Sequence, residues 1–408
     1  MGSWLAAQGL AGSTAGADFV RGIYWLPNPV SGLPTRASQA EWFASFMAAG
    51  TSSRTYWDAS GKLRSNLAAN QPRFSWESGR RRLVLEDALT NKLECRKHNP
   101  VDAGKIAVGA PPAGATYGVA DRPDEIAAMG LDPICTNGKV YFADNPSGSG
   151  APFFIYPVGL TGNVNPHTLD LFGWSTGAGT KPTLRLESGG TGAKIIESSP
   201  GRVTCPGLTP GSSSDRIVII VWPGTTVFFI LPGLYEQAFA PHAPIPGDAL
   251  AAVTRPIESF QILPAIVSML AGGATALVRG KLTTPAPNAR VLGGRSSVAL
   301  ISRGPSDANI TAYNQVVALR ADSDDGGFSS DFGAVFAGSN APSRKVCLNG
   351  SAIAEDANET GVTDGVVYLG RCAALSAPVG SGFYDQTAWF PEIADNARIQ
   401  SLAVPYAA

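Results

Sequence analysis

The middle of the chain, residues 99–254, alternates short apolar runs with clusters of Gly, Pro, Ser and Asn. Short runs rich in Val, Ile, Phe and Tyr that end at turn residues are typical of β-strands. Several such strands in close succession favour a β-sandwich. The predicted strands of this first sandwich are residues 139–142, 153–156, 183–186, 217–222 and 226–231.

Residues 255–408 repeat this pattern and predict a second sandwich. The apolar run 387–390 ends at Pro391. Residues 395–402 are then expected to form one short helix, with Asp395 as its cap. The predicted strands of this second sandwich are residues 276–280, 298–301, 312–320, 333–336, 346–349 and 366–369.

The first 98 residues differ from the rest. In residues 39–47, which read QAEWFASFM, the apolar positions have helical spacing. We interpret residues 1–50 as an attachment segment and residues 51–98 as a β-hairpin connector. In that connector, the turn 58–61 joins the strands 55–57 and 62–64.

The composition supports an all-β fold, because 47 Gly, 31 Pro and 9% aromatic residues among 408 suit strands joined by many turns. Charged residues make up only 15% and the formal net charge is −1, so the chain lacks the basic surface that nucleic acid requires. We therefore expect no nucleic-acid partner.

No segment predicts export or membrane insertion. Residues 1–19 contain no Lys or Arg, so we expect no secretory signal there. The longest apolar stretch, residues 262–278, is interrupted by Pro264, Gly272 and Gly273 and is too short to span a bilayer.

The cysteines predict neither a disulfide framework nor a zinc site, because their number is odd and their spacing is irregular. We interpret most of them as buried free thiols, although Cys347 and Cys372 could be neighbours on adjacent strands. The five cysteines are Cys95, Cys135, Cys205, Cys347 and Cys372.

Three separated stretches carry a resemblance to a known family. Residues 56–61 read YWDASG, residues 68–74 read AANQPRF and residues 83–93 read LVLEDALTNKL. In this order they resemble a segment that precedes jelly-roll or concanavalin-like modules in many phage virion proteins. Residues 233–255 look like the exit from the jelly roll, and residues 368–371 with 389–402 are similar to the closing strands and final helix of laminin-G-like modules.

The resemblance implies a spike or fibre protein of a phage or a gene transfer agent particle, including the glycan-binding head spikes of gene transfer agents. It also implies the fold: a jelly-roll sandwich over residues 99–254 and a laminin-G or concanavalin-like sandwich over residues 255–408. The first 50 residues match nothing in this family. We therefore expect them to face the particle, and we expect their deletion to prevent incorporation while leaving the sandwiches folded.

Catalytic motifs are missing from the sequence. None of the three histidines, His98, His167 and His242, lies in an HxH, HExxH or nucleophile-elbow pattern. Glu86 and Asp87 are adjacent, so on a strand they would point to opposite faces and form a poor glycosidase pair. We expect Glu86 to make structural hydrogen bonds and the protein not to be an enzyme.

One acidic turn is a candidate calcium site. Asp322, Asp324 and Asp325 supply oxygen ligands just before Gly326, and Asp331 lies close enough to join them. The later Glu of an EF-hand is missing, and an acidic, solvated hairpin tip explains the same residues. Calcium is therefore a possible cofactor, and no other is expected.

Sugar binding requires exposed aromatic rings that stack on the apolar face of a sugar, with planar polar groups for the hydroxyls. The alternative for each candidate ring, which the usual burial of Trp and Tyr in sandwiches favours, is a core or interface aromatic. The candidates nearest to predicted turns are Trp174, Tyr313, Asn314, Tyr384 and Asp385.

These observations leave three hypotheses for the function. The first is a structural spike or fibre on the surface of a phage-like particle, assembled in the bacterial cytoplasm, that binds capsular polysaccharide of the host cell. The second is a purely architectural connector of the particle, and the third, least favoured, is a polysaccharide depolymerase. The expected partners are the cell-surface polysaccharide, other particle proteins through the N-terminus, and further copies of the chain in a homo-oligomer.

Overall fold

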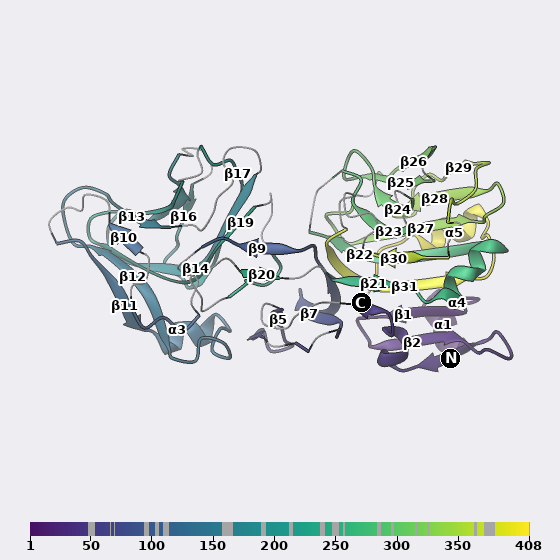
Figure 1. Ribbon diagram of the computed structural model, residues 1–408, viewed down its shortest axis with the longest axis horizontal. Helices are drawn as coiled ribbons and strands as arrows, with labels where there is room; N and C mark the ends of the chain where they lie inside the picture. The colour runs from purple at the N-terminus through teal and green to yellow at the C-terminus, as the bar shows by residue number, and fades with distance from the viewer. Residues whose placement is uncertain are drawn as a thin grey trace. The chain divides into compact units, whose positions relative to one another are not determined.

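The chain folds into antiparallel β-sheets with a few short helices (Figure 1), which confirms the all-β prediction. The computed structural model describes residues 1–47, 54–65, 67, 68, 70–93, 98–102, 106–108, 114–156, 166–188, 193–211, 215–236, 241–246, 253–255, 258–283, 287–294, 298–314, 316–324, 326–362, 365–370 and 380–407.

The chain divides into two compact units. The terminal unit comprises Met1–Ala49, Ala69–Asp87 and Ile257–Ala408, and the middle unit comprises Gly50–Ala68 and Ala88–Pro256. This division differs from the predicted succession of segments, because residues 1–49 fold with the C-terminal sandwich and the predicted connector 51–98 is shared between the units. Sequence order alone does not show which strands far apart in the chain will pair.

The terminal unit is a sandwich of two sheets. One sheet has ten strands in the order β29-β28-β27-β22-β31-β1-β2-β3, with β8 also paired to β31 and β7 paired to β8. Its strands are β1 (Ala15–Asp18), β2 (Ile23–Pro27), β3 (Pro34–Ala37), β7 (Arg73–Glu77), β8 (Arg80–Leu85), β22 (Ala274–Leu282), β27 (Phe332–Gly338), β28 (Arg344–Leu348), β29 (Ala354–Asp356) and β31 (Gly382–Phe390).

The second sheet of this unit has seven strands. In spatial order they are β26 (Ala318–Asp322), β25 (Asn309–Tyr313), β24 (Ala299–Arg303), β23 (Arg290–Gly294), β30 (Val367–Leu369), β21 (Ser259–Gln261) and β4 (Phe46–Met47). The segment before β22 adds α4 (Pro264–Val267) and the 3-10 helix η1 (Ser268–Ala271).

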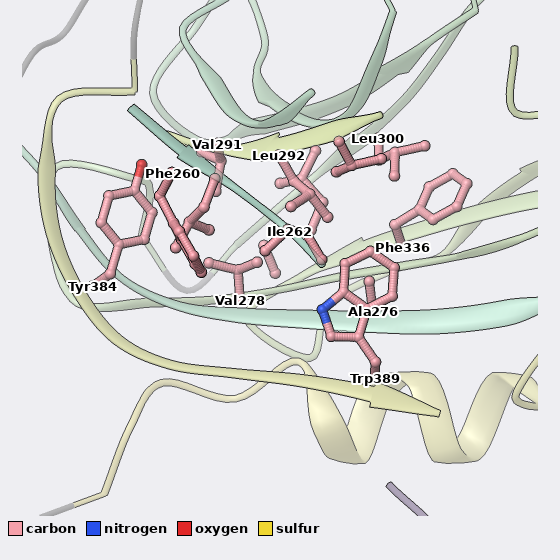
Figure 2. Packing of buried hydrophobic residues seen from close by; sticks show 14 of the residues in the cluster. Phe260, Ile262, Ala276, Val278, Val291, Leu292, Leu300, Phe336, Tyr384 and Trp389 are labelled. Atoms are coloured by element: carbon pink, nitrogen blue, oxygen red, sulfur yellow. The ribbon is translucent and has the colours of Figure 1, made fainter. Parts of the chain in front are cut away.

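The core of the terminal unit lies between these two sheets (Figure 2). Val278 and Trp389 of the ten-stranded sheet face Phe260, Leu292 and Leu300 of the other sheet, and all five are fully or almost fully buried. Burying a large apolar side chain stabilises a fold by about 1.5–3 kcal/mol. This shared core is therefore the main force that holds the two sheets together.

The ten-stranded sheet is also covered on its other face. Leu277 and Ala388 alternate with the core residues along β22 and β31, so they point away from the sandwich. They pack in a second cluster with Leu5 of α1 (Gly2–Ala7) and with Ile399 and Leu402 of α5 (Asn396–Leu402). The central strand β31 is buried along its whole length as a result.

The N-terminal segment is an integral part of this sheet. β1 pairs with β31 and with β2, and the ring of Trp25 lies so close to β1 that a Cβ at Gly16 would come within 2.3 Å of it. Removing the segment would expose an edge of β31 and part of the second cluster. The expectation that its deletion leaves the sandwiches folded therefore does not agree with the structure.

The two predicted helices near the chain ends are present, one of them shortened. Asp395 caps α5, and its side chain accepts a hydrogen bond of 2.7 Å from the backbone N–H of Arg398. At 39–47 the helix α2 (Gln39–Trp42) is a single turn that begins with a capping box between Ser38 and Glu41. Phe46 and Met47 belong to β4 instead, because pairing with β21 takes precedence over helical spacing.

A buried ion cluster joins the hairpin β7–β8 to the segment that precedes β21. Arg73 donates from Nε to Glu258 at 2.9 Å and from Nη2 to both Glu258 and Glu86. Arg73 and Glu258 have no solvent exposure, and the side chain of Glu86 has 7%. The expected structural role of Glu86 is thus confirmed, and Arg73 belongs to the family-like motif 68–74.

The middle unit is a second sandwich. Its seven-stranded sheet comprises β11 (Thr116–Asp121), β12 (Lys139–Asn145), β19 (Thr225–Tyr235), β14 (His167–Gly177), β17 (Gly201–Leu208), β9 (Leu89–Asn91) and β20 (Val253–Arg255). Its five-stranded sheet has the order β10 (Ile106–Val108), β13 (Ala151–Ile155), β18 (Ile217–Val221), β15 (Thr183–Leu186) and β16 (Lys194–Ile195).

The predicted hairpin around the turn 58–61 is confirmed. β5 (Tyr56–Trp57) pairs with β6 (Leu63–Arg64), and the carboxylate of Asp58 accepts hydrogen bonds from the backbone N–H groups of Ser60 and Lys62, each at 2.9 Å. Desolvation opposes the charge of Asp58, but a hydrogen bond from the Ser60 hydroxyl, these two backbone bonds and one from Arg64 hold its pKa well below the usual range. The turn is thus fixed by local chemistry.

In the middle unit too, the central strands β14 and β19 of one sheet are buried on both faces over most of their length. Between the sheets, Phe153 and Ile219 of the five-stranded sheet pack against Phe229 of the other. On its outer face, the seven-stranded sheet packs against Ile126 of α3 (Pro123–Ala128) and against Leu63. Figure 1 shows α3 and β13 on opposite sides of this sheet.

Three cysteines lie within the described residues: Cys135, Cys205 and Cys347 are buried and carry free thiols. Burial raises the pKa of the Cys205 and Cys347 thiols to about 11 each. Cys95 and Cys372 lie outside the described residues. Of the helices that the structure describes, none is long and apolar enough to cross a membrane.

The buried ion cluster of Arg73, Glu86 and Glu258 is expected to stabilise the terminal unit. Arg73→Met removes the guanidinium that both buried carboxylates contact, so we expect a loss of about 3–5 kcal/mol in the free energy of unfolding of the terminal unit. Urea denaturation followed by tryptophan fluorescence measures this loss. Arg320→Met on β26, which is exposed, is the control and should cost less than about 0.5 kcal/mol. A loss below about 1 kcal/mol for Arg73→Met would contradict the proposed role.

Asp356 on the edge strand β29 is expected to make the stability of the protein depend on pH. Desolvation opposes the charge of Asp356, but hydrogen bonds from Arg344 and Asn358 lower its pKa below the ordinary value of 3.8. A lowered folded pKa stabilises the protein above about pH 4, and this stabilisation is lost as the pH falls through the folded pKa. The stability difference between wild type and Asp356→Asn should therefore shrink from pH 6 to pH 3 in urea titrations. A difference that stays constant over this range would refute the assignment.

Candidate binding surface on the five-stranded sheet

The outer face of the five-stranded sheet carries aromatic and arginine side chains. Phe153, Ile155, Ile217 and Ile219 point into the core, so the residues between them point outward. Register pairs Phe154 with Val218 and Val218 with Arg185, and Glu187 lies opposite Arg216. We define the aromatic–arginine face as Phe154, Tyr156, Thr183, Arg185, Glu187, Arg216, Ile220 and Trp222.

Two aromatic rings of this face are accessible to solvent. Trp222 is 37% exposed and Tyr156 is 36% exposed, and neither belongs to a hydrophobic core cluster of the described residues. Gly150 makes room for Trp222, because a Cβ there would lie 3.1 Å from the indole ring. A larger residue at this position would push the ring away from the sheet.

Arg216 contacts two aromatic residues of this face, Phe154 and Tyr156. Its guanidinium lies 3.7 Å from the ring centre of Phe154, donates from Nε to Glu187 at 2.7 Å, and donates from Nη1 to the hydroxyl of Tyr156 at 3.2 Å. The hydrogen bond to Glu187 is the largest contribution that raises the pKa of Arg216, and the same bond lowers the pKa of Glu187. Arg216 therefore stays charged and has its own carboxylate partner.

Arg185 has no such partner. It forms no ion pair and no hydrogen bond through its side chain with any residue that the structure describes, and its Nε is shielded from solvent. Its neighbour Val218 is only 2% exposed, since Arg185 and Phe154 flank it on the two adjacent strands. The face thus offers one arginine whose hydrogen-bonding capacity is unused within the described chain.

A pocket of about 390 Å³ lies beside this face, next to the edge strand β16. Ile195, which is 54% exposed, lines the pocket and is also the register partner of Thr183 on the aromatic–arginine face. The pocket lies within the size range of small-molecule sites. Its lining comprises Gly173, Lys194, Ile195, Glu197, Ser199, Gly201, Arg202, Val203 and Thr204.

Arg202 and Glu197, two of the three charged residues that line this pocket, are engaged with other protein groups. Arg202 donates from Nε and Nη2 to Asp170 at 2.8 Å each and from Nη1 to the carbonyl of His242 at 2.8 Å. Glu197 pairs with Lys181. Ile195 connects this pocket to the aromatic–arginine face, since it lines the pocket and pairs in register with Thr183.

A second pocket, of about 500 Å³, lies in the terminal unit beside the edge strand β3. The hairpin β2–β3 that borders it carries the exposed side chains of Val30 and Leu33 at its tip. An apolar pocket next to exposed aliphatic side chains suits a protein contact better than a polar ligand. Its lining comprises Met1, Trp4, Ile23, Pro34, Thr35 and Arg36.

Three of the sequence-predicted sugar-binding residues are buried. Trp174 is 2% exposed and stacks on Phe228 with 5.2 Å between ring centres, so neither face of its ring is open to a sugar. Tyr384 is fully buried, and its hydroxyl donates to the carbonyl of Gly380. Asp385 is also fully buried and accepts from Nε of Arg82 at 2.7 Å.

Asp385 is not a catalytic carboxyl despite its shifted pKa. Desolvation raises the pKa of Asp385 to about 6, although Arg82 opposes this shift. A carboxyl with such a pKa suits acid–base chemistry only if a substrate can reach it. Because it has no solvent exposure and is bonded to a buried arginine, its role is to hold β31 to β8.

Tyr313 and Asn314 are half-buried at the end of β25. Asn314 fixes the following turn, since its side chain accepts from the N–H of Val317 at 2.9 Å and donates to the carbonyl of Glu359. Its amide is therefore used within the fold. The predicted residues also divide between the units, Trp174 in the middle unit and the others in the terminal unit.

The predicted calcium turn is described in part. Asp322 and Asp324 are exposed; the Asp322 carboxylate accepts from the amide of Asn309, and the Asp324 backbone N–H lies 3.3 Å from the Ser351 hydroxyl. Asp331 pairs instead with Arg80 and Arg82. Asp325 lies outside the described residues. Within the described part of the chain, no group of three or more acidic, His or Cys side chains could hold a metal ion.

The aromatic–arginine face is not among the sites predicted from the sequence. The segments 153–156, 183–186 and 217–222 were predicted as strands, but 153–156 and 217–222 are apolar on both faces, so alternation does not show which face is outside. The signal that could have been used is the position of the aromatics: Tyr156 and Trp222 end their runs beside turn residues, where a strand leaves the core.

The comparisons with known proteins identify no family. No family model matches the chain, and no curated protein matches it. Among solved structures, the CBM40 domain of a Ruminococcus gnavus IT-sialidase bound to α2,3-sialyllactose is 13% identical and covers 34% of this chain and 86% of its own, with a TM-score of 0.27.

Two further solved structures are similarly distant. The CBM22 tandem domain of Paenibacillus barcinonensis Xyn10C is 9% identical and covers 75% of this chain and 98% of its own, with a TM-score of 0.23. A Trypanosoma rangeli sialidase is 9% identical and covers 84% of this chain and 63% of its own, with a TM-score of 0.27. At these TM-scores the likeness carries no weight for fold or function.

Proposed function

We propose that this protein is a non-enzymatic structural component, a spike or fibre, of a phage or gene transfer agent particle, and that it binds host cell-surface polysaccharide. The observation that carries the binding proposal is the aromatic–arginine face of the middle unit. This face combines exposed aromatic rings with planar polar groups on one rigid sheet. Such a combination is what sugar recognition requires.

The rigidity of the face favours binding. Tyr156, Phe154 and Arg216 are held together by cation–π contacts and by the hydrogen bonds to Glu187. A pre-ordered surface loses little side-chain entropy when a ligand binds. Each face would bind a sugar chain weakly, and several copies on one particle would raise the avidity without new contacts.

The particle role is supported by the sequence resemblance and not by the comparisons. The family-like motifs include Arg73 and Glu86, whose buried pairing organises the terminal unit. Contact with other particle proteins through the N-terminus, homo-oligomerisation, location on the particle surface and assembly in the bacterial cytoplasm belong to this same proposal.

The absence of enzymatic activity is proposed on the chemistry of the face. A glycosidase needs two carboxyl groups about 5–10 Å apart across the scissile bond. Among the residues of the aromatic–arginine face, Glu187 is the single carboxylate, and it is engaged by Arg216. A carboxylate that is already held in an ion pair is a poor general acid.

A second candidate function is a purely architectural one. The observation that favours it is the apolar pocket beside β3 together with the exposed Val30 and Leu33. These residues would contact another particle protein. The two functions are compatible, because the pocket belongs to the terminal unit and the aromatic–arginine face to the middle unit.

The glycan proposal makes a prediction about binding. We expect Trp222→Ala to weaken binding to purified capsular polysaccharide from candidate hosts roughly tenfold, because a stacked aromatic contributes about 0.5–1.5 kcal/mol beyond its buried area. A pull-down with labelled polysaccharide, followed by a binding titration, measures this. Trp76→Ala is the matched control, since Trp76 is also 37% exposed but lies in the terminal unit.

The outcomes separate the hypotheses. Specific binding that Trp222→Ala weakens and Trp76→Ala leaves unchanged supports the proposal. Equal effects of both substitutions would place the site elsewhere, and no binding by a multivalent form would favour the architectural function. A reducing-end assay of the incubated polysaccharide should show no new chain ends, and new ends would establish a depolymerase.

A further inference from the structure

Arg185 is distinguished from the other arginine of the aromatic–arginine face by its lack of a partner. Arg216 is neutralised by Glu187, to which it donates through Nε and Nη2. Arg185 forms no ion pair within the described chain, and its Nε has neither solvent nor a hydrogen-bond acceptor. The named residues of the face therefore carry one uncompensated positive charge.

An arginine in this state is costly to the isolated protein. The shielded Nε–H has no acceptor among the described residues and lies out of reach of an external ligand, so a ligand would bind through Nη1 and Nη2, which are not among the shielded atoms. The guanidinium fork matches the two oxygens of a carboxylate, and this charge-assisted pair is stronger than a bond to a neutral hydroxyl. A ligand that brings a carboxylate to Arg185 would thus gain more than a neutral one.

The position of Arg185 makes such contact compatible with aromatic stacking. Val218 is its register partner, and Trp222 lies four residues further along from Val218 on the same face. At about 3.3 Å per residue, the two positions are roughly 13 Å apart along the strand. This span suits a chain of several sugars that stacks on Trp222 and reaches Arg185 further along.

We propose that the aromatic–arginine face recognises an acidic polysaccharide, with Arg185 binding the carboxylate of a uronic-acid type sugar. This inference rests on the proposed glycan binding and adds the chemical class of the glycan. Arg185 supplies charge selectivity, whereas Trp222 and Tyr156 supply stacking that acidic and neutral sugars share.

The test compares charged polymers with neutral copies of themselves. The probes are polygalacturonate, alginate and hyaluronan, each beside the same polymer after chemical reduction of its carboxyl groups to alcohols. We expect the full chain to bind at least one native polymer roughly tenfold more tightly than its reduced form, and we expect this preference to fall with added salt. Biolayer interferometry with immobilised polymer measures both.

The variants assign the preference to one residue. Arg185→Gln should abolish the preference, so that the native and the reduced polymer bind with equal affinity, and Arg185→Lys, which keeps the charge but not the fork, should retain part of the preference. Arg320→Gln removes an exposed arginine of the terminal unit and should change neither affinity. Circular dichroism spectra that match wild type verify that the variants fold.

The outcomes distinguish failure of the acidic-sugar inference from failure of the proposed glycan binding. Equal binding of native and reduced polymers, or a preference that survives Arg185→Gln, would overturn the acidic-sugar inference and leave glycan binding intact. Failure to bind any of the three native polymers would also overturn it, while the capsular polysaccharide titration decides separately whether the face binds glycans at all.

Discussion

The pairing of β1 with β31 is the constraint on which the terminal unit depends. Register places Ala15 opposite Trp389 and Asp18 opposite Gln386, so segments near the two ends of the chain share one sheet. Tyr406 extends this connection, since its hydroxyl donates to the carboxylate of the buried Asp18. The N-terminal hairpin, α1 and α5 all take their positions from this pairing. A surface that the N-terminal segment offers to a partner is therefore held by the sandwich itself.

Buried arginines that pair with carboxylates help to fix how the strands of the terminal unit pack. Arg73, Arg82 and Arg344 have almost no side-chain exposure, and each is matched by carboxylates from other strands or from neighbouring turns. Desolvating such groups is expensive, so each pair constrains where its strands lie more than it adds stability. Against this background Arg185 differs from them, because the described chain gives it no carboxylate.

In each unit the central strands of one sheet are buried on both faces, and this limits where a binding surface can lie. In the middle unit the seven-stranded sheet is covered by the core on one side and by α3 on the other. The five-stranded sheet is left to present its outer side chains. A rigid sheet with rings anchored by Arg216 is suited to contact with an extended ligand.

The sequence alone determined the features that local chemistry fixes. The turn at Asp58, the cap at Asp395 and the strand runs 139–142 and 333–336 follow from hydrogen bonds and alternation within a few residues. The tertiary structure alone decided that β1 joins β31, that Trp174 and Asp385 are buried, and that Trp222 and Arg185 face outward. The physical reason is that strands with apolar residues on both faces carry no local signal for their exposed side. Only the packing of the two sheets assigns it.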